Sequence, residues 1–392
     1  MNAVIVSAKR TAVGSFNGSL STIEAPKLGA TAIKAALESA YISPNDIDEC
    51  IMGEVLTAGV GQAPARQAAL LAGLPQKVPC LTINKVCGSG LKAVMLASDL
   101  IRLGEASTIV AGGQESMSLS PYLLEKVRTG YRMGSQTLVD SMIKDGLWDP
   151  GYNWHMGNAA ELCVKEKNFT RDEQDQFSKE SYEFALKAQR ESLFKNEIVG
   201  VKTESKAGPT LIDQDEEPTK YQPDKMAKLK PAFEKDGTVT AANASKINDG
   251  GAAVVVMSDT KAKSLALKPL VKIVDYTTFA QDPKWFTTAP VGAVKKLLER
   301  TNLKTKDIDH WEINEAFAAV AMVAMKELGI DRKLVNPFGG AVAIGHPIGA
   351  SGARILTTLV HGLTRNNARY GIATLCIGGG EAVAMLVENV RG

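Results

Sequence analysis

The sequence predicts an α/β protein made of two similar halves. Stretches rich in Val and Ile, typical of buried strands, alternate along the chain with helix-like stretches of about 10–15 residues. Three short motifs also occur twice in the same order. At 392 residues the chain exceeds the roughly 100–200 residues of one domain, so we expect a duplicated domain rather than an array of short repeats.

Each half begins with the same kind of elements. An apolar strand is expected at Met1–Val6, and a helix follows in which apolar residues recur at helical spacing. The repeated motifs are residues 46–48 with 307–309, 87–92 with 349–354, and 109–113 with 375–379. We expect the motifs at residues 87–92 and 349–354 each to open an amphipathic helix. Loops of both halves can then meet across a pseudo-twofold axis.

A segment of different character, residues 119–246, interrupts the first half. It is rich in charge, its second part contains four prolines, and it has no counterpart in the second half. Within it, residues 171–194 predict a long surface helix packed on one side. We therefore divide the chain into a first half (1–118 plus 247–269), an inserted covering domain (119–246) and a second half (270–392).

The composition excludes several classes of function. The 45 basic and 43 acidic side chains leave a net charge of +2, which indicates no nucleic acid partner. No apolar run reaches the ~18 residues of a membrane-spanning helix. The five cysteines and four histidines form no C-x-x-C pair and no metal-ligand spacing. We expect a cytoplasmic protein with no metal and no bound cofactor.

Cys87 is the first candidate for chemistry. It precedes Gly88-Ser89-Gly90 in a passage that predicts a strand, a turn and a helix, and this places its sulfur at a helix N-terminus. Unpaired backbone N–H groups and the helix dipole stabilise a thiolate there and lower the pKa of the thiol, which favours a nucleophile. The alternative is a buried cysteine that only fills space.

Two further candidates lie in glycine-rich loops of the second half. His346, between Gly345 and Pro347, suits general-base chemistry because imidazole titrates near neutral pH. A structural hydrogen bond in a tight loop is the alternative. Cys376 ends an apolar strand before three glycines, whose N–H groups can hold an oxyanion. A core cysteine beside a turn is the alternative there.

Asn314 is the fourth candidate. It leads the segment Asn314-Glu315-Ala316-Phe317-Ala318, which we expect to open a helix. Capping that helix is the structural role of such an asparagine. The same side chain can also hold a water molecule at the mouth of a site.

Together these motifs resemble the thiolase family, in particular its acetyl-CoA acetyltransferase branch, over essentially the whole chain. The resemblance rests on six blocks in order: residues 84–90, 155–157, 243–245, 314–317, 345–349 and 376–380. It implies two α/β/α halves that form a five-layered αβαβα core beside the inserted loop domain. The implied activity is the reversible Claisen condensation of two acetyl-CoA molecules to acetoacetyl-CoA and CoA, with the thioesters as substrates.

The resemblance also implies a role for each candidate. In a ping-pong reaction, His346 would activate Cys87, which takes up the acetyl group and releases CoA. Cys376 would then deprotonate a second acetyl-CoA, whose carbanion attacks the acetyl-cysteine. One oxyanion hole would combine His346 with a water held by Asn314. The other would use the N–H groups of Cys87 and Gly378.

The binding of CoA and the assembly of subunits are implied in the same way. His155 and Ser245 would contact the pantetheine arm of CoA. The apolar lining of the acyl and pantetheine tunnel would be Leu147, Met156, Phe233 and Phe317, for which core packing is the alternative. Residues 125–142 resemble the loop through which family dimers pair, so a homotetramer is expected.

The sequence departs from the family pattern at three places. Pro218 is followed by Thr219 and Lys220, where the family commonly has an Arg near the nucleotide phosphates. Trp285 and Phe286 stand where the acetyl-specific branch usually has a small residue and Met. Bulk at Phe286 should affect the acyl end of the substrate. Residues 336–339 replace a more polar version of that loop.

Three other functions compete with this interpretation. A longer-chain 3-ketoacyl-CoA thiolase of β-oxidation is the nearest, although Lys85-Val86 before Cys87 and the compact block at 155–157 favour the short-chain branch. A decarboxylating ketoacyl synthase would lack the second cysteine. A non-catalytic CoA- or lipid-binding relative would have lost Cys87, Cys376 or His346, and the sequence retains all three.

Overall fold

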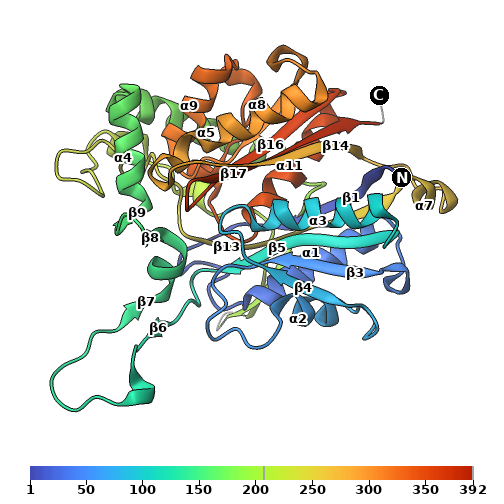
Figure 1. Cartoon of the computed structure of the whole chain (residues 1–392), viewed down its shortest axis with the longest axis horizontal. Coiled ribbons are helices and arrows are strands. Elements are labelled where there is room, and N and C mark those ends of the chain that lie inside the picture. Colours follow the sequence, from blue (N-terminus) through green and yellow to red (C-terminus); the bar gives the residue numbers. More distant parts are fainter. Residues whose placement is uncertain (206–207, 391–392) are drawn as a thin grey trace.

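The computed structural model describes residues 1–205 and 208–390. Figure 1 shows five stacked layers, in which two sheets alternate with three layers of helices. The α/β class and the five-layered core expected from the sequence are confirmed. No helix in the described part of the chain is long and apolar enough to span a membrane.

The strands of the core follow one another in the order β15-β16-β17-β14-β1-β13-β5-β3-β4. The sheet of the first half comprises β1 (Ala3–Thr11), β13 (Asn248–Ser258), β5 (Thr108–Ser116), β3 (Glu49–Gly53) and β4 (Cys80–Ile83). The sheet of the second half comprises β14 (Val271–Ala280), β17 (Glu381–Asn389), β16 (Tyr370–Ile377) and β15 (His310–Ile313). Among the strands of the described residues, the two sheets are joined where Val4 and Ile5 pair with Lys272 and Val271.

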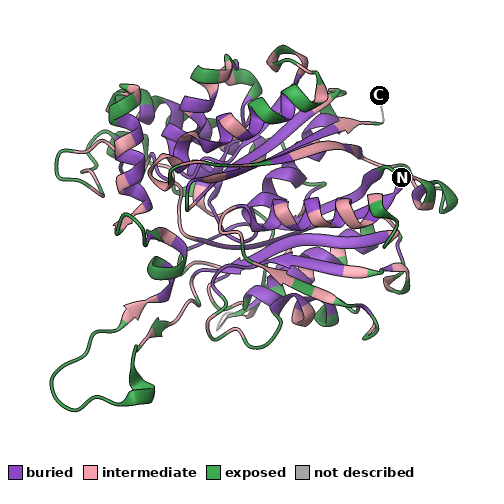
Figure 2. Cartoon of the chain, viewed as in Figure 1, coloured by how far each residue is buried: buried purple, intermediate pink, exposed green. Residues whose placement is uncertain are grey.

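Helices cover both outer faces and fill the middle layer. The outer helices are α1 (Ala25–Ser39) and α2 (Pro64–Leu71) on the first half, and α8 (Ala289–Thr301) and α9 (Ala318–Leu328) on the second. The middle layer holds α3 (Ser89–Leu103) and α11 (Ser351–Asn366), which contact each other between the sheets. Figure 2 shows these central helices and the strands largely buried, whereas the outer helices expose one face.

The expected duplication is visible in matching hydrogen bonds. In the first half, Asp48 accepts from the N–H groups of Ser107 and Thr108 at 2.7 and 2.9 Å. In the second half, Asp309 accepts from the N–H groups at 369 and 370 at 2.8 and 3.0 Å. Each carboxylate therefore fixes the start of the neighbouring strand, which explains why the motif around it occurs twice.

Glycines bring α3 and α11 together near their N-termini. A Cβ at Gly90 would lie 2.7 Å from the backbone N of Ala353, and one at Gly352 would lie 2.3 Å from that of Leu91. The two contacts are reciprocal, as a pseudo-twofold axis requires. Both helices are amphipathic, as expected, but α11 is buried nearly all round because a sheet lies on either side of it.

The segment between β5 and β13 forms the covering structure. It contains α4 (Met156–Lys167), α5 (Arg171–Arg190), α6 (Pro223–Met226) and the short strands β6 (Tyr122–Leu123), β7 (Val139–Asp140), β8 (Trp148–Asp149), β9 (Trp154–His155), β10 (Ile198–Val199), β11 (Val201–Ser205) and β12 (Gly208–Ile212). Thr170 opens the predicted long helix with a reciprocal cap to Glu173. The exposed stretch between β6 and β7 projects away from the body as an arm (Figure 1).

Short elements complete the chain. They are β2 (Gly14–Ser15), α7 (Asp259–Ser264), α10 (Ala341–Ile344), and the short 3₁₀ or π segments η1 (Pro44–Asp46), η2 (Val127–Thr129), η3 (Met142–Leu147), η4 (Glu217–Lys220), η5 (Pro283–Thr288), η6 (Thr305–Asp307) and η7 (Arg332–Leu334). Among them, α10 matters most for the site, because it ends immediately before Gly345 and His346.

Candidate active site

Cys87 lies in a tight turn just before α3. Val86 has a φ of 45°, and Ser89 secures the turn by donating to the carbonyl of Val86 at 2.7 Å and accepting from the N–H of Lys85 at 2.8 Å. A Cβ at Gly88 would lie 2.4 Å from Cδ1 of Ile377. The glycine therefore allows the loop after β16, in the second half, to approach Cys87 closely.

Two backbone N–H groups, those of Gly378 and of Cys87 itself, lie close enough to the Cys87 sulfur to lower the pKa of its thiol. Burial nevertheless dominates and raises the pKa of the thiol to about 11, with a further contribution from the charge of Glu115. The expectation that the helix N-terminus would lower this pKa is wrong, because desolvation outweighs the N–H groups. Cys87 is a thiol at neutral pH and needs a base to become a nucleophile.

Cys376 is fully buried at the end of β16. Burial raises the pKa of its thiol well above the usual value, and the nearby Cys87 raises it further. The two sulfurs are therefore close enough to influence each other's ionisation. Either thiol can give up a proton, but the loss of both at once is disfavoured.

His346 is held by contacts at its backbone and at one ring nitrogen. Its N–H donates to Oδ1 of Asn248 at 2.9 Å, and its Nδ1 lies 2.5 Å from Oγ of Ser351. Because the Ser351 hydroxyl donates to the carbonyl of Pro347 at 2.8 Å, it accepts from Nδ1–H of the histidine. This assigns the lone pair to Nε2. Burial, together with the charge of Arg354, lowers the pKa of His346 to about 3, so the ring is neutral at physiological pH and Nε2 keeps its lone pair.

Asn314 does not cap a helix, contrary to expectation. It follows β15 directly, and α9 begins only at Ala318. The intervening residues instead contact the loop at 243–245, through a bridge between Phe317 and Ala244 and a bond from the N–H of Ala318 to the carbonyl of Asn243 at 2.8 Å. The side chain of Asn314 therefore does not cap a helix. Its Nδ2 lies 3.5 Å from Nε2 of His346.

The four candidate residues come from loops of both halves. Gly378 lies near Cys87, Cys87 lies near Cys376, and Asn314 lies beside His346. Ile348, two residues after the histidine, packs in one apolar cluster with Cys87 and Leu147. Buried Oδ1 of Asn314 has no hydrogen-bond partner among the described protein groups, so it can accept from a substrate or a water molecule.

The residues expected to line a tunnel lie on both sides of the thiols. Met156, Phe286 and Phe317 are buried in one cluster with Cys376, and Phe233 packs against it. The ring of Phe317 meets those of Phe233 and Phe286 edge-on at 6.0 and 6.2 Å. Phe286, the residue that departs from the family pattern, is thus placed at the second thiol.

The residues assigned to pantetheine have structural contacts as well. His155 caps α4 by accepting from the N–H of Gly157 at 3.0 Å, and its ring stacks on Phe233 at 4.8 Å. Ser245 is partly exposed and donates its N–H to the carbonyl of Ala316 at 2.9 Å. Lys220 is paired with Glu216 at 3.1 Å and bonded to Ser15 at 2.5 Å.

Sequence reasoning missed three residues that organise these loops: Ser351, Asn248 and Glu115. Glu115 is fully buried and accepts from the N–H groups of Val55, Leu56 and Gly349 at 3.1, 3.1 and 2.8 Å. It therefore ties the loop after β3 to the loop of His346. A charged residue inside an apolar strand was the available signal, because a buried carboxylate requires donors.

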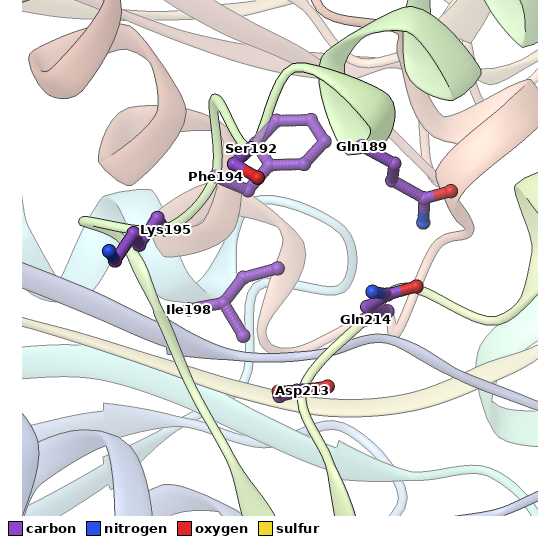
Figure 3. A pocket seen from close by; sticks show the side chains of 7 residues that line it. All are labelled: Gln189, Ser192, Phe194, Lys195, Ile198, Asp213 and Gln214. Atoms are coloured by element: carbon purple, nitrogen blue, oxygen red, sulfur yellow. The ribbon is translucent and has the colours of Figure 1, made fainter.

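A separate cavity of about 380 Å³ lies within the covering segment. Figure 3 shows that its side chains come from the end of α5, the loop and strand that follow it, and the stretch after β12. The lining residues are Gln189, Ser192, Phe194, Lys195, Ile198, Asp213 and Gln214. None of the four candidate residues lines it, so it is not part of the candidate active site.

Known proteins share this fold and these motifs. Residues 3–260 match the thiolase N-terminal domain, and residues 267–389 match the thiolase C-terminal domain. An acetyl-CoA acetyltransferase from Cupriavidus necator is 54% identical over 98% of this chain and 99% of its own length. One from Pseudomonas aeruginosa is 51% identical over the same shares.

A solved structure extends the likeness to three dimensions. The Acat5 thiolase from Ascaris suum, crystallised in complex with coenzyme A, has a TM-score of 0.95 and 42% identity, and all of each chain is covered. Both thiolase domains are matched in order, and the five-layered core agrees with this neighbour. The chain therefore belongs to the thiolase family.

Proposed function

We propose that this thiolase is an acetyl-CoA C-acetyltransferase, which converts two acetyl-CoA molecules to acetoacetyl-CoA and CoA by way of an acetyl-Cys87 intermediate. The observation that carries the proposal is that two backbone N–H groups lie close to the Cys87 sulfur, beside a second buried thiol. The carbonyl oxygen of an acyl group on Cys87 would lie near these donors. Donors fixed before the reaction stabilise the oxyanion of acyl transfer.

The first half-reaction loads the enzyme. Nε2 of His346 takes the thiol proton, and the Cys87 sulfur attacks the thioester carbon. The oxyanion is held by the N–H groups of Cys87 and Gly378. When the carbon–sulfur bond to CoA breaks, the CoA thiolate takes the proton of Cys376. Acetyl-Cys87, free CoA, an imidazolium and a Cys376 thiolate remain.

The second half-reaction forms the carbon–carbon bond. The Cys376 thiolate removes a methyl proton from a second acetyl-CoA, and the enolate oxygen is stabilised by the imidazolium of His346 and by a water on Asn314. The carbanion attacks the acetyl carbon and expels the Cys87 thiolate. That thiolate takes the proton of His346, which restores both thiols and the neutral ring. A high pKa for Cys376 makes its thiolate a strong base for this weakly acidic carbon.

The acyl group is proposed to be short. Phe286 is 3% exposed and, with Phe317, packs against the cluster that contains Cys376. We propose that these rings restrict the acyl end of the substrate to a short chain. CoA-dependent cleavage of 3-ketoacyl-CoAs of four to ten carbons tests this proposal. A steep fall in kcat/KM beyond four carbons is expected, and equal rates at four and ten carbons would favour the longer-chain thiolase instead.

We propose that CoA thioesters are the substrates of the enzyme and that it uses no metal and no further cofactor. The exposed arm between β6 and β7 is proposed to join dimers into a homotetramer, as the resemblance at residues 125–142 implies. A cytoplasmic location fits the unpaired cysteines. Sedimentation of the wild type and of a chain shortened in this arm would test the assembly.

A further inference from the structure

The loop at 243–246, where the covering segment returns to the first half, is held against the active-site loops. The N–H of Ser245 donates to Ala316, and the N–H of Ala318 donates to Asn243. These backbone bonds place the loop alongside the residues that follow Asn314. Whatever fixes this loop therefore also fixes Ser245 relative to the reacting groups.

Lys246 ends this loop and turns its ammonium inward. Its Nζ donates to the carbonyl of Ala244 at 2.9 Å and to the carbonyl of Val342 at 3.3 Å. The same nitrogen lies 5.7 Å from the centre of the Tyr182 ring, on α5. One cation therefore contacts three segments that are far apart in the sequence: the Ser245 loop, α10 and α5.

The contact with α10 connects Lys246 to the catalytic histidine. Val342 lies in α10, which ends directly before Gly345 and His346. The N–H of Val342 donates to Glu315 at 3.2 Å, and its carbonyl accepts from Lys246. Both backbone groups of this residue are thus bonded to charged side chains beside the site.

Two opposing effects act on the charge of the Lys246 amine: burial and nearby carboxylates. Burial lowers the pKa of Lys246 to about 8, while the carboxylates of Glu217 and Glu315 act in the opposite direction. Tyr182 stacks on Tyr221 at 4.6 Å, which fixes the ring that faces the ammonium. Burying a charge is expensive, and an apolar side chain would hold a merely structural contact at lower cost.

We propose that Lys246 is a positioning residue that acts as a tethered cation: its ammonium sets the spacing between the Ser245 loop and the α10 segment that carries His346. The inference rests on the proposed function, because Ser245 is taken to hold the pantetheine arm of CoA. Lys246 does not touch the reacting atoms. It acts by fixing the binding loop against the catalytic loop.

The test compares Lys246→Ala and Lys246→Met with the wild type and with Lys263→Ala, a control at an exposed lysine on α7. Steady-state acetoacetyl-CoA cleavage should show KM for the CoA substrates raised roughly tenfold in both variants, since charge-assisted hydrogen bonds are lost, with a smaller effect on kcat. Lys263→Ala should behave as the wild type.

Chemical rescue distinguishes positioning from general stability. Ammonium chloride should restore KM of Lys246→Ala, because the truncated side chain leaves room for NH₄⁺ between the two carbonyls. It should not restore Lys246→Met, whose side chain fills that space. Equal concentrations of sodium or choline chloride control for ionic strength, and melting temperatures are recorded in each salt.

The outcomes separate this inference from the proposed function. If the wild type cleaves no acetoacetyl-CoA, the proposed function fails. If the wild type is active but KM of Lys246→Ala is unchanged, or does not respond to ammonium, the positioning role is wrong. Variants that remain unfolded in ammonium chloride would likewise assign Lys246 a structural role only.

Discussion

The backbone N–H of Gly378 lies close enough to the sulfur of Cys87 to lower the pKa of its thiol. This contact brings the loop after β16, in the second half, against the turn before α3, in the first. The nucleophile and its oxyanion donor therefore come from opposite halves of a duplicated fold. A change that shifts the halves relative to each other should disturb chemistry before it disturbs folding.

Ser351 should be essential for orienting His346. Ser351→Ala removes the acceptor of Nδ1–H, so the ring can turn and the wrong tautomer becomes available. We expect kcat of acetoacetyl-CoA cleavage to fall roughly tenfold to a hundredfold, with a smaller change in KM. Thr364→Ala, in the same helix but away from the site, should leave kcat unchanged. Equal values for the wild type and Ser351→Ala would refute the orienting role.

Glu115 should contribute to the low reactivity of the Cys87 thiol. Its negative charge raises the pKa of the thiol, so Glu115→Gln should lower this pKa and increase the thiolate fraction at a given pH. The rate of inactivation by iodoacetamide should rise with pH toward a midpoint of about 11 in the wild type and toward a lower midpoint in the variant. A midpoint that does not move, in a variant shown to be folded, would remove Glu115 from the electrostatics of the site.

The stability of the protein should decrease as the pH falls below the pKa of an ordinary histidine. His346 has a pKa of about 3 in the folded state, whereas an unfolded histidine titrates near 6.5. The unfolded chain therefore takes up this proton first, and stability is lost as the pH drops from about 6.5 toward 3. Full uptake corresponds to about 1.4 kcal/mol per pH unit.

Urea unfolding between pH 7.5 and 5.5 measures this contribution. The free energy of unfolding should fall more steeply in the wild type than in His346→Gln, because the glutamine has no proton to bind. His155 and His361 also have lowered pKa values, so the difference between the two proteins, rather than the total slope, is the relevant quantity. Parallel curves would show that His346 is not held neutral by the fold.

Phe286 should limit the length of the acyl group. Phe286→Ala removes a buried ring beside Cys376 and opens space at the acyl end. We expect kcat/KM for a six-carbon 3-ketoacyl-CoA, relative to acetoacetyl-CoA, to rise about tenfold or more, the worth of one or two methylenes in an apolar pocket. Leu334→Ala, at an exposed position, should leave the ratio unchanged. An unaltered ratio in the Phe286 variant would place the limit elsewhere.

Much of the fold could be predicted because its signals are local. The motif around Asp48 recurs around Asp309, since both carboxylates cap the start of a neighbouring strand. The position of Asn314 could not be predicted, because the helix start is displaced by pairing with residues 243–245, which are distant in sequence. Pattern alone favours a helix cap at such an asparagine.

The prediction of a lowered pKa for the Cys87 thiol is wrong for a similar reason. A helix N-terminus is visible in the sequence, but the burial that outweighs it arises only when the second half covers the turn. The roles of Ser351 and Lys246 likewise depend on partners such as Pro347 and Val342 that only the folded chain brings into position. Motifs in the sequence therefore predict which residues are candidates for catalysis, but they do not predict the contacts that hold those residues in place.

The identity of the acyl carrier is the central claim, and acetyl labelling tests it most directly. The protein is mixed with radiolabelled acetyl-CoA, quenched in acid and digested, and the labelled peptide is identified by mass spectrometry. We expect a burst of label on Cys87 in the wild type and in Cys376→Ser, and no label in Cys87→Ser, with Cys80→Ser as the control thiol. Label on any other residue of the wild type, or its persistence in Cys87→Ser, would contradict the mechanism.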